Sequence, residues 1–181
     1  TPSTNELNKP RQNKIHIILT GGTIDSYYDG AKDTVDPLKH SIIPKYFEML
    51  ELLNKIVFTE VCMKDSRSLT RKDVSKILKA IENSPCNKVI VAHGTYTMPD
   101  TARYILANIK RKDQTIVLTG SMIPIEGFSP SDGPFNLGFT FAKIEELPNG
   151  VFISMQGKIY EPNEVAKDMK RGRFYSIFMK K

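Results

Sequence analysis

The chain has 181 residues, of which 40% are hydrophobic and 25% are charged, and its formal net charge is +6. These fractions are ordinary for a soluble globular protein, and the length suits one domain with a substantial core. No apolar run reaches the roughly 18 residues of a membrane-spanning helix, so we expect no membrane segment.

The first 13 residues are polar and interrupted by proline, which predicts a mobile lead-in rather than a signal peptide. Apolar patterning begins only after this segment. We therefore expect residues 14–181 to form a single domain, and we expect the protein to be cytoplasmic.

Five short apolar runs rich in β-branched residues predict strands. They lie at residues 14–20, 55–63, 88–93, 114–120 and 150–155. Between the second and third runs, "TRKDVSKILKAIEN" places apolar residues at helical spacing, and Thr70 with Asp73 offers a capping pair.

The segment after Met98 repeats this helical spacing, with Pro99 in its first turn, and two further helices are predicted at 44–53 and 134–146. Residues 24–43 show no periodicity and predict a long loop of the kind that often carries function. The alternation of strands and helices predicts an α/β fold with a doubly wound, mostly parallel sheet and flanking helices.

The patterns of cysteines, histidines and charges do not favour a disulfide framework, a zinc site or a nucleic-acid site. Cys62 lies in a predicted strand and Cys86 in a loop, so we expect no disulfide framework. The spacing of cysteines and histidines predicts no zinc site, and we expect no cofactor. Much of the positive charge lies in "KDMKRGRFYSIFMKK", which predicts a solvated basic tail and makes nucleic-acid binding a minority hypothesis.

Three of the predicted strands end in a glycine beside a hydroxyl. The sequences are TGGT (20–23), HGT (93–95) and TGS (119–121). Ligands of an open parallel sheet bind at the carboxyl ends of its strands, and glycine lets backbone N–H groups approach a ligand. Any one of these could be ordinary turn chemistry, but the set predicts a site for a small polar or anionic ligand. A nucleotide fits less well, because neither G-x-G-x-x-G nor GK[ST] is present.

A threonine hydroxyl is a weak nucleophile that needs a base or a lowered pKa. Lys167, in "NEVAKDM", is a candidate base because a desolvated lysine can lose its proton near neutral pH. From the sequence alone, a solvated lysine is the simpler interpretation.

Four ordered motifs resemble those of the N-terminal, Rossmann-like domain of the bacterial-type L-asparaginases, which convert asparagine to aspartate and ammonia. "TGGTI" is identical to the first family motif, and "HGTYTM" differs at one position from HGTDTM. "VLTGSMIP" followed by "SDGPFNL" is similar to LTGAMRP and ADGPxNL, and "NEVAK" is similar to the segment with the catalytic lysine. The resemblance runs from about Ile15 to Phe174.

The resemblance implies a role for each matching residue. Thr23 would attack the side-chain amide carbon, while Thr95 and Lys167 would form a Thr-Lys pair that assists proton transfer or activates water. Ser66 would hold the substrate carboxylate. Further pocket residues are implied at Gly22, Gly94 and Ser121, and structural roles at Asp132, Gly133 and Asn136.

Three positions depart from the family pattern. Tyr96 replaces the aspartate that anchors the α-ammonium of the substrate, so a neutral phenol stands where a carboxylate is expected, unless the phenol turns to solvent. Tyr27 or Tyr28 would stand in for the flap tyrosine that activates the nucleophile. Ile123 replaces an arginine.

The chain also ends where relatives continue into a second domain, whose copy in a neighbouring subunit completes the site. The resemblance therefore predicts a homo-oligomer, and it predicts either an excised domain or a natural single-domain relative without the usual C-terminal domain.

Three functions are compatible with the sequence. The first is an asparaginase-like amidohydrolase acting on L-asparagine or a related small amino-acid amide through a threonine nucleophile. The second is a catalytically impaired member that binds a small molecule or a protein partner, as Tyr96 would suggest. The third, nucleic-acid binding, rests on charge alone.

Overall fold

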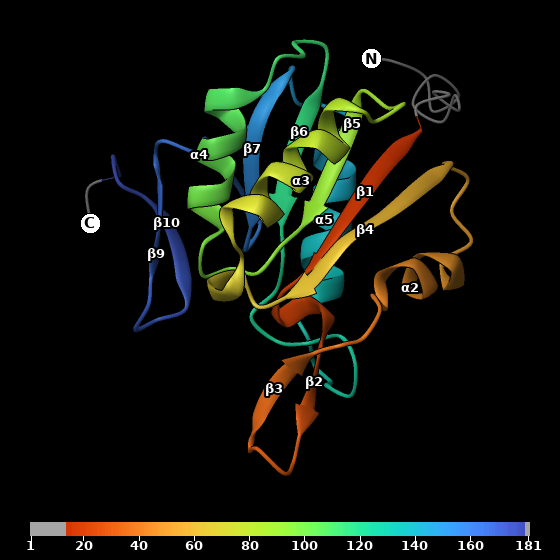
Figure 1. The fold of residues 1–181 in the computed structure, drawn as a ribbon, viewed down its shortest axis with the longest axis vertical. Helices are drawn as coiled ribbons and strands as arrows, with labels where there is room; N and C mark the ends of the chain where they lie inside the picture. The colour runs from red at the N-terminus through yellow and green to blue at the C-terminus, as the bar shows by residue number, and fades with distance from the viewer. Residues whose placement is uncertain (1–13, 180–181) are drawn as a thin grey trace, which may run out of the picture.

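A six-stranded sheet forms the centre of the protein in a computed structural model that describes residues 14–179 (Figure 1). Its strand order is β4-β1-β5-β6-β7-β8. The strands are β4 (Ile56–Lys64), β1 (Ile15–Gly21), β5 (Lys88–Ala92), β6 (Thr115–Thr119), β7 (Gly150–Met155) and β8 (Lys158–Tyr160). All neighbours pair in parallel except β7 and β8, so the predicted α/β class and the five predicted strands are confirmed. The predicted lead-in at residues 1–13 lies outside the described residues.

Helices cover both faces of the sheet, as a doubly wound fold requires. In Figure 1, α3 (Arg71–Glu82) and α4 (Met98–Asn108) lie in front of the sheet and α5 (Gly133–Lys143) lies behind it. The helix α2 (Ile43–Met49) packs with α5 in the second core cluster. Both faces of the sheet are therefore buried against helices. This explains why the central strands are continuous apolar runs rather than alternating apolar and polar residues.

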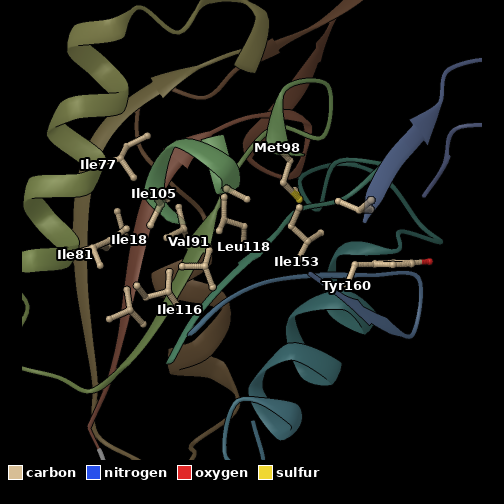
Figure 2. Packing of buried hydrophobic residues seen from close by; sticks show 14 of the residues in the cluster. Ile18, Ile77, Ile81, Val91, Met98, Ile105, Ile116, Leu118, Ile153 and Tyr160 are labelled. Carbon is tan, nitrogen blue, oxygen red and sulfur yellow. The ribbon is translucent and has the colours of Figure 1, made fainter. Parts of the chain in front are cut away.

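The front core joins the four parallel strands β1, β5, β6 and β7 to α3 and α4. Figure 2 shows Ile18, Val91 and Leu118 of the sheet against Ile77 of α3 and Met98 of α4. Successive residues of β1 alternate between the faces, since Ile17 and Leu19 belong to the second cluster instead. The sheet is thus fixed from both sides, and its strand ends can serve as a rigid platform.

The predicted helices form, with shorter ends than expected at two of them. In α3, the side chain of Thr70 accepts from the backbone of Asp73 and the Asp73 carboxylate accepts from Thr70, which confirms the capping box. The helix α2 ends at Met49 rather than 53, because Glu51 adopts a left-handed backbone with φ of 47°. The helix α5 ends at Lys143 rather than 146, shortly before Pro148, where a helix is disfavoured.

The prediction of a long loop at residues 24–43 was wrong. A 3₁₀ turn (Thr23–Asp25) leads into a hairpin of β2 (Ser26–Asp29) and β3 (Thr34–Pro37), which projects below the sheet in Figure 1. The hairpin strands are only four residues long and largely solvent-exposed, so they lack the buried pattern that signals a strand.

The predicted basic tail is a folded hairpin, although its basic residues Lys170, Arg171 and Arg173 are exposed as expected. Residues of this segment form the hairpin of β9 (Val165–Asp168) and β10 (Arg173–Ser176). Phe174 is only 1% exposed and belongs to the front core with Tyr160 and Val165. The alternation of β10, with Phe174 and Ser176 inward and its other two residues outward, was hidden among basic residues.

No helix within residues 14–179 is long and apolar enough to cross a membrane. The two cysteines, Cys62 on β4 and Cys86 before β5, are free thiols.

Phe174 should be the anchor of the β9–β10 hairpin. We expect Phe174→Ala to lower the free energy of unfolding by roughly 3–5 kcal/mol, because it removes a fully buried aromatic ring and leaves a cavity. Phe178→Ala is the matched control, since that ring is 75% exposed and its loss should change stability by less than about 0.5 kcal/mol. Urea unfolding of both variants measures the difference, and equal effects would contradict the anchoring role.

Candidate functional site

A hollow of about 200 Å³ lies at the carboxyl ends of the parallel strands, where an open α/β sheet binds ligands. Its lining comes from the residues after β1, β4 and β5 and from β9. The lining residues are Gly22, Thr23, Asp65, Ser66, Arg67, Gly94, Thr95, Tyr96 and Lys167. Seven of these are residues that the sequence predicts for the site.

Glycines allow the strand ends to meet this closely. Gly22 has φ of 85°, and a Cβ there would overlap the backbone of Gly94. A Cβ on Gly94 would in turn lie 2.7 Å from the Cβ of Ser66, well inside the contact limit. Side chains at either glycine would push the threonine-bearing turns apart, so both glycines set the width of the site.

Hydrogen bonds between the loop after β4 and the loop after β5 fix Ser66 in the lining of the hollow. The backbone N–H of Thr97 donates to Ser66 Oγ over 3.2 Å, and Thr97 Oγ1 donates to the Ser66 carbonyl over 3.1 Å. Ser66 is buried, and its hydroxyl hydrogen is not used in either contact. It can therefore donate to a ligand oxygen.

The β9–β10 hairpin brings Lys167 to Thr95. Lys167 Nζ donates to Thr95 Oγ1 over 2.7 Å, although the two residues are 72 positions apart in sequence. Thr95 is buried and Lys167 is half-buried. Desolvation, and next the positive charge of Arg67, lower the pKa of Lys167, while Asp65 opposes this shift. The solvated lysine that the sequence favoured is thus replaced by a half-buried lysine whose pKa is lowered.

Thr23 lies at the start of the 3₁₀ turn after β1, with its side chain partly exposed to the hollow. Asp25 anchors the turn, because its buried carboxylate accepts from Ser41 Oγ over 2.6 Å and from the N–H of Ile42 over 2.9 Å. No side-chain partner of the Thr23 hydroxyl is found among the described residues. A hydroxyl in this position is free to meet a ligand.

His93 does not line the hollow. Its ring is fully buried, and desolvation lowers its pKa to about 4. Its Nδ1 lies 2.7 Å from the carbonyl of Gly94, so the neutral ring supports the turn that presents Thr95. Lys167 is therefore the candidate base at this end of the sheet.

Asp65 and Arg67 are two lining residues that the motifs in the sequence did not reveal. The Asp65 carboxylate accepts from Arg67 Nε over 3.0 Å and from Arg67 Nη2 over 2.8 Å. The Arg67 guanidinium also lies 5.3 Å from the ring centre of Tyr96. Both residues directly follow the predicted strand at 55–63 in "KDSRS", so the same strand-end rule could have found them.

Three predicted site residues lie outside the hollow. Ser121 is buried and its hydroxyl donates to the carbonyl of Ile123 over 2.6 Å. Tyr27 and Tyr28 lie exposed on the β2–β3 hairpin, where the Tyr28 hydroxyl donates to Asp33 over 2.6 Å. Tyr96 does line the hollow, with 49% of its surface exposed, so its phenol is neither buried in the site nor turned wholly to solvent.

The residues predicted to be structural do support a loop. The Asp132 carboxylate accepts from the N–H groups of Met122 and Ile123, and Asn136 Nδ2 donates to the carbonyl of Gly120 over 2.8 Å. These contacts hold the segment after β6. Within residues 14–179, no cluster of three or more histidine, cysteine or acidic side chains is arranged to hold a metal ion.

The chain is similar to several known proteins. The family model described as "Asparaginase, N-terminal" matches residues 14–174. A glutaminase-asparaginase from Acinetobacter glutaminasificans is 30% identical over 172 residues, which cover 86% of this chain and 50% of the relative. An L-asparaginase 2 from Bacillus subtilis is 28% identical over 167 residues, covering 84% of this chain and 43% of the relative. A glutamyl-tRNA(Gln) amidotransferase component from Metallosphaera sedula is 28% identical over 151 residues, covering 80% of this chain and 34% of the relative.

Solved structures show the same fold. The thermostable L-asparaginase from Thermococcus kodakarensis superposes with a TM-score of 0.78 at 25% identity, covering 92% of this chain and 52% of that one. A probable cytoplasmic L-asparaginase from Campylobacter jejuni gives a TM-score of 0.75 at 27% identity, with coverages of 91% and 53%. The chain spans about half the length of the curated relatives it matches.

The positive charge of Arg67 should keep the pKa of Lys167 low. Arg67→Gln removes this charge and leaves Asp65 unpaired, and both changes stabilise the ammonium form, so we expect the pKa of Lys167 to rise. NMR titration of the lysine side-chain signals measures this, with the Lys167 signal assigned by its loss in Lys167→Met. Lys64, paired with Asp73 at 2.8 Å, is the internal control and should not move. A fall or no change at Lys167 would contradict this effect of Arg67.

Proposed function

Because the chain belongs to the asparaginase family, we propose that it hydrolyses the side-chain amide of L-asparagine or a related small amide, with Thr23 as the nucleophile. The observation that carries this proposal is the 2.7 Å contact between Lys167 and Thr95 beside Thr23 in one hollow. A nucleophile, a base and a group that orients the base are the parts that covalent acyl transfer requires.

The first half of the reaction forms an ester. Thr23 Oγ attacks the amide carbon and loses its proton, the C–N bond breaks, and the nitrogen takes up a proton to leave as ammonia. The acyl group then remains on Thr23. Ser66, whose hydroxyl hydrogen is free, would hold a carboxylate oxygen of the substrate and so place the amide carbon near Thr23.

The second half releases the acid. A water molecule gives up a proton as its oxygen attacks the ester carbon, the C–O bond to Thr23 breaks, and the threonine hydroxyl is restored. Lys167, in its neutral amine form, would accept a proton through Thr95 in this cycle. Because burial and Arg67 already lower the pKa of Lys167, the neutral form is more populated than that of a solvated lysine.

The alternative is a protein of the same fold that binds a small molecule without chemistry. Tyr96 is the residue that suggests it, but the phenol is half exposed and leaves Thr23, Thr95 and Lys167 together around the hollow. The intact Thr-Lys pair therefore favours an enzyme. Self-association and a cytoplasmic location are part of the proposal, and light scattering and cell fractionation would test them.

Ammonia release from small amides tests the proposed chemistry. We expect Thr23→Ala to abolish release, because no acyl acceptor remains, and Lys167→Met to lower kcat by about 10²–10⁴-fold, because proton transfer loses its base. Thr115→Ala is the matched control: this buried threonine lies at the opposite end of the sheet, where its hydroxyl donates to the Pro148 carbonyl. Its folded fraction should retain full activity. Release that survives Thr23→Ala would rule out Thr23 as the nucleophile.

A further inference from the structure

The hollow offers no net negative charge to a cationic ligand. Its lining includes the Arg67 guanidinium, the Lys167 amine and one carboxylate, Asp65, while the remaining lining residues are neutral. With Lys167 neutral, as the proposed reaction requires, Arg67 balances Asp65, and with Lys167 protonated the lining is net positive, so no field draws an ammonium group into the hollow.

The single carboxylate is already engaged. Asp65 accepts from the backbone N–H of Arg67 over 2.8 Å as well as from the guanidinium at Nε and Nη2. This fork-shaped pairing directs both carboxylate oxygens at Arg67 rather than at a ligand. Among the lining residues that the structure describes, none offers an uncommitted carboxylate for an ammonium group.

Arg67, in contrast, has donors to spare. Its guanidinium carries five N–H bonds, and the contacts to Asp65 use Nε and Nη2. Within residues 14–179, no acceptor is found for Nη1. The ring of Tyr96 lies 5.3 Å from the guanidinium carbon, so the ring and Asp65 together restrain a side chain that is otherwise largely exposed. A restrained guanidinium with a free edge is suited to binding a carboxylate.

We propose that this hollow selects an amide that bears a carboxylate but no α-ammonium group, and that it prefers succinamate, which is asparagine without its amino group, to L-asparagine. The inference rests on the proposed function, because the amide is still cleaved at Thr23. The same chemistry applies: the C–N bond of succinamate breaks, water supplies the new oxygen, and succinate and ammonia are released. Tyr96 contributes by restraining Arg67 and by lining the hollow with a side chain that is not a carboxylate.

The test compares kcat/KM for ammonia release from succinamate and from L-asparagine. We expect at least a tenfold preference for succinamate in the unaltered protein. Arg67→Gln should reduce the preference, and Arg67→Gln combined with Tyr96→Asp should shift it further towards L-asparagine, because a cation is lost and a carboxylate is gained. Arg71→Gln is the matched control, since Arg71 lies four positions along the chain, is exposed and does not line the hollow, so the preference should be unchanged.

The outcomes separate this inference from the function on which it rests. If ammonia is released with a kcat/KM for L-asparagine equal to or greater than that for succinamate, the inference is overturned and the amidohydrolase proposal stays intact. Release from neither substrate would instead count against the proposed function. In that event, thermal stabilisation by the two product acids decides the inference: greater stabilisation by succinate than by L-aspartate supports it. Equal or greater stabilisation by L-aspartate, or none by either acid, overturns it.

Discussion

The contact between Lys167 and Thr95 depends on two separate parts of the fold. Thr95 is presented by the rigid carboxyl end of β5, whereas Lys167 arrives on a hairpin that closes the described chain. Phe174 packs that hairpin against the front core. The packing of Phe174 therefore positions Lys167 for its hydrogen bond to Thr95. Lys167 itself is half-buried on this hairpin, and the desolvation lowers its pKa.

The close approach of the strand ends is the second constraint on the site. Gly22 and Gly94 have no room for a Cβ, and this brings the turns after β1, β4 and β5 around one small hollow. The hollow is polar in its lining, and its functional groups come from residues that belong to four different strand ends or hairpins. The polar side chains of the hollow thus lie mostly on loops at the strand ends. The sheet that carries these loops is held by apolar packing on both faces.

Much of the fold and of the candidate site could be predicted from the sequence. The features that were missed have identifiable physical reasons. The central strands, α3 and α4 have strong apolar periodicity, the motifs at the strand ends pointed to Thr23 and Thr95, and the family resemblance pointed to Ser66. The hairpins at 26–37 and 165–176 were missed because their strands are short and their inward residues are few. The partnership of Arg67 with Asp65 and Tyr96 is a matter of side-chain geometry, and no spacing in the sequence encodes it. Ser121 followed the same strand-end pattern but turned its hydroxyl to a local carbonyl.

The most direct test of the proposed chemistry is to identify which threonine carries the acyl group during turnover. Rapid acid quenching of the protein mixed with an amide substrate, followed by trypsin digestion and mass spectrometry, separates the two candidates, because Thr23 lies in the peptide 15–32 and Thr95 in the peptide 89–103. We predict an ester on Thr23 alone, and we expect the ester to accumulate in Lys167→Met if that lysine serves the hydrolysis step. An ester on Thr95, or ammonia release without an ester on either peptide, would contradict the assignment of Thr23 as the nucleophile.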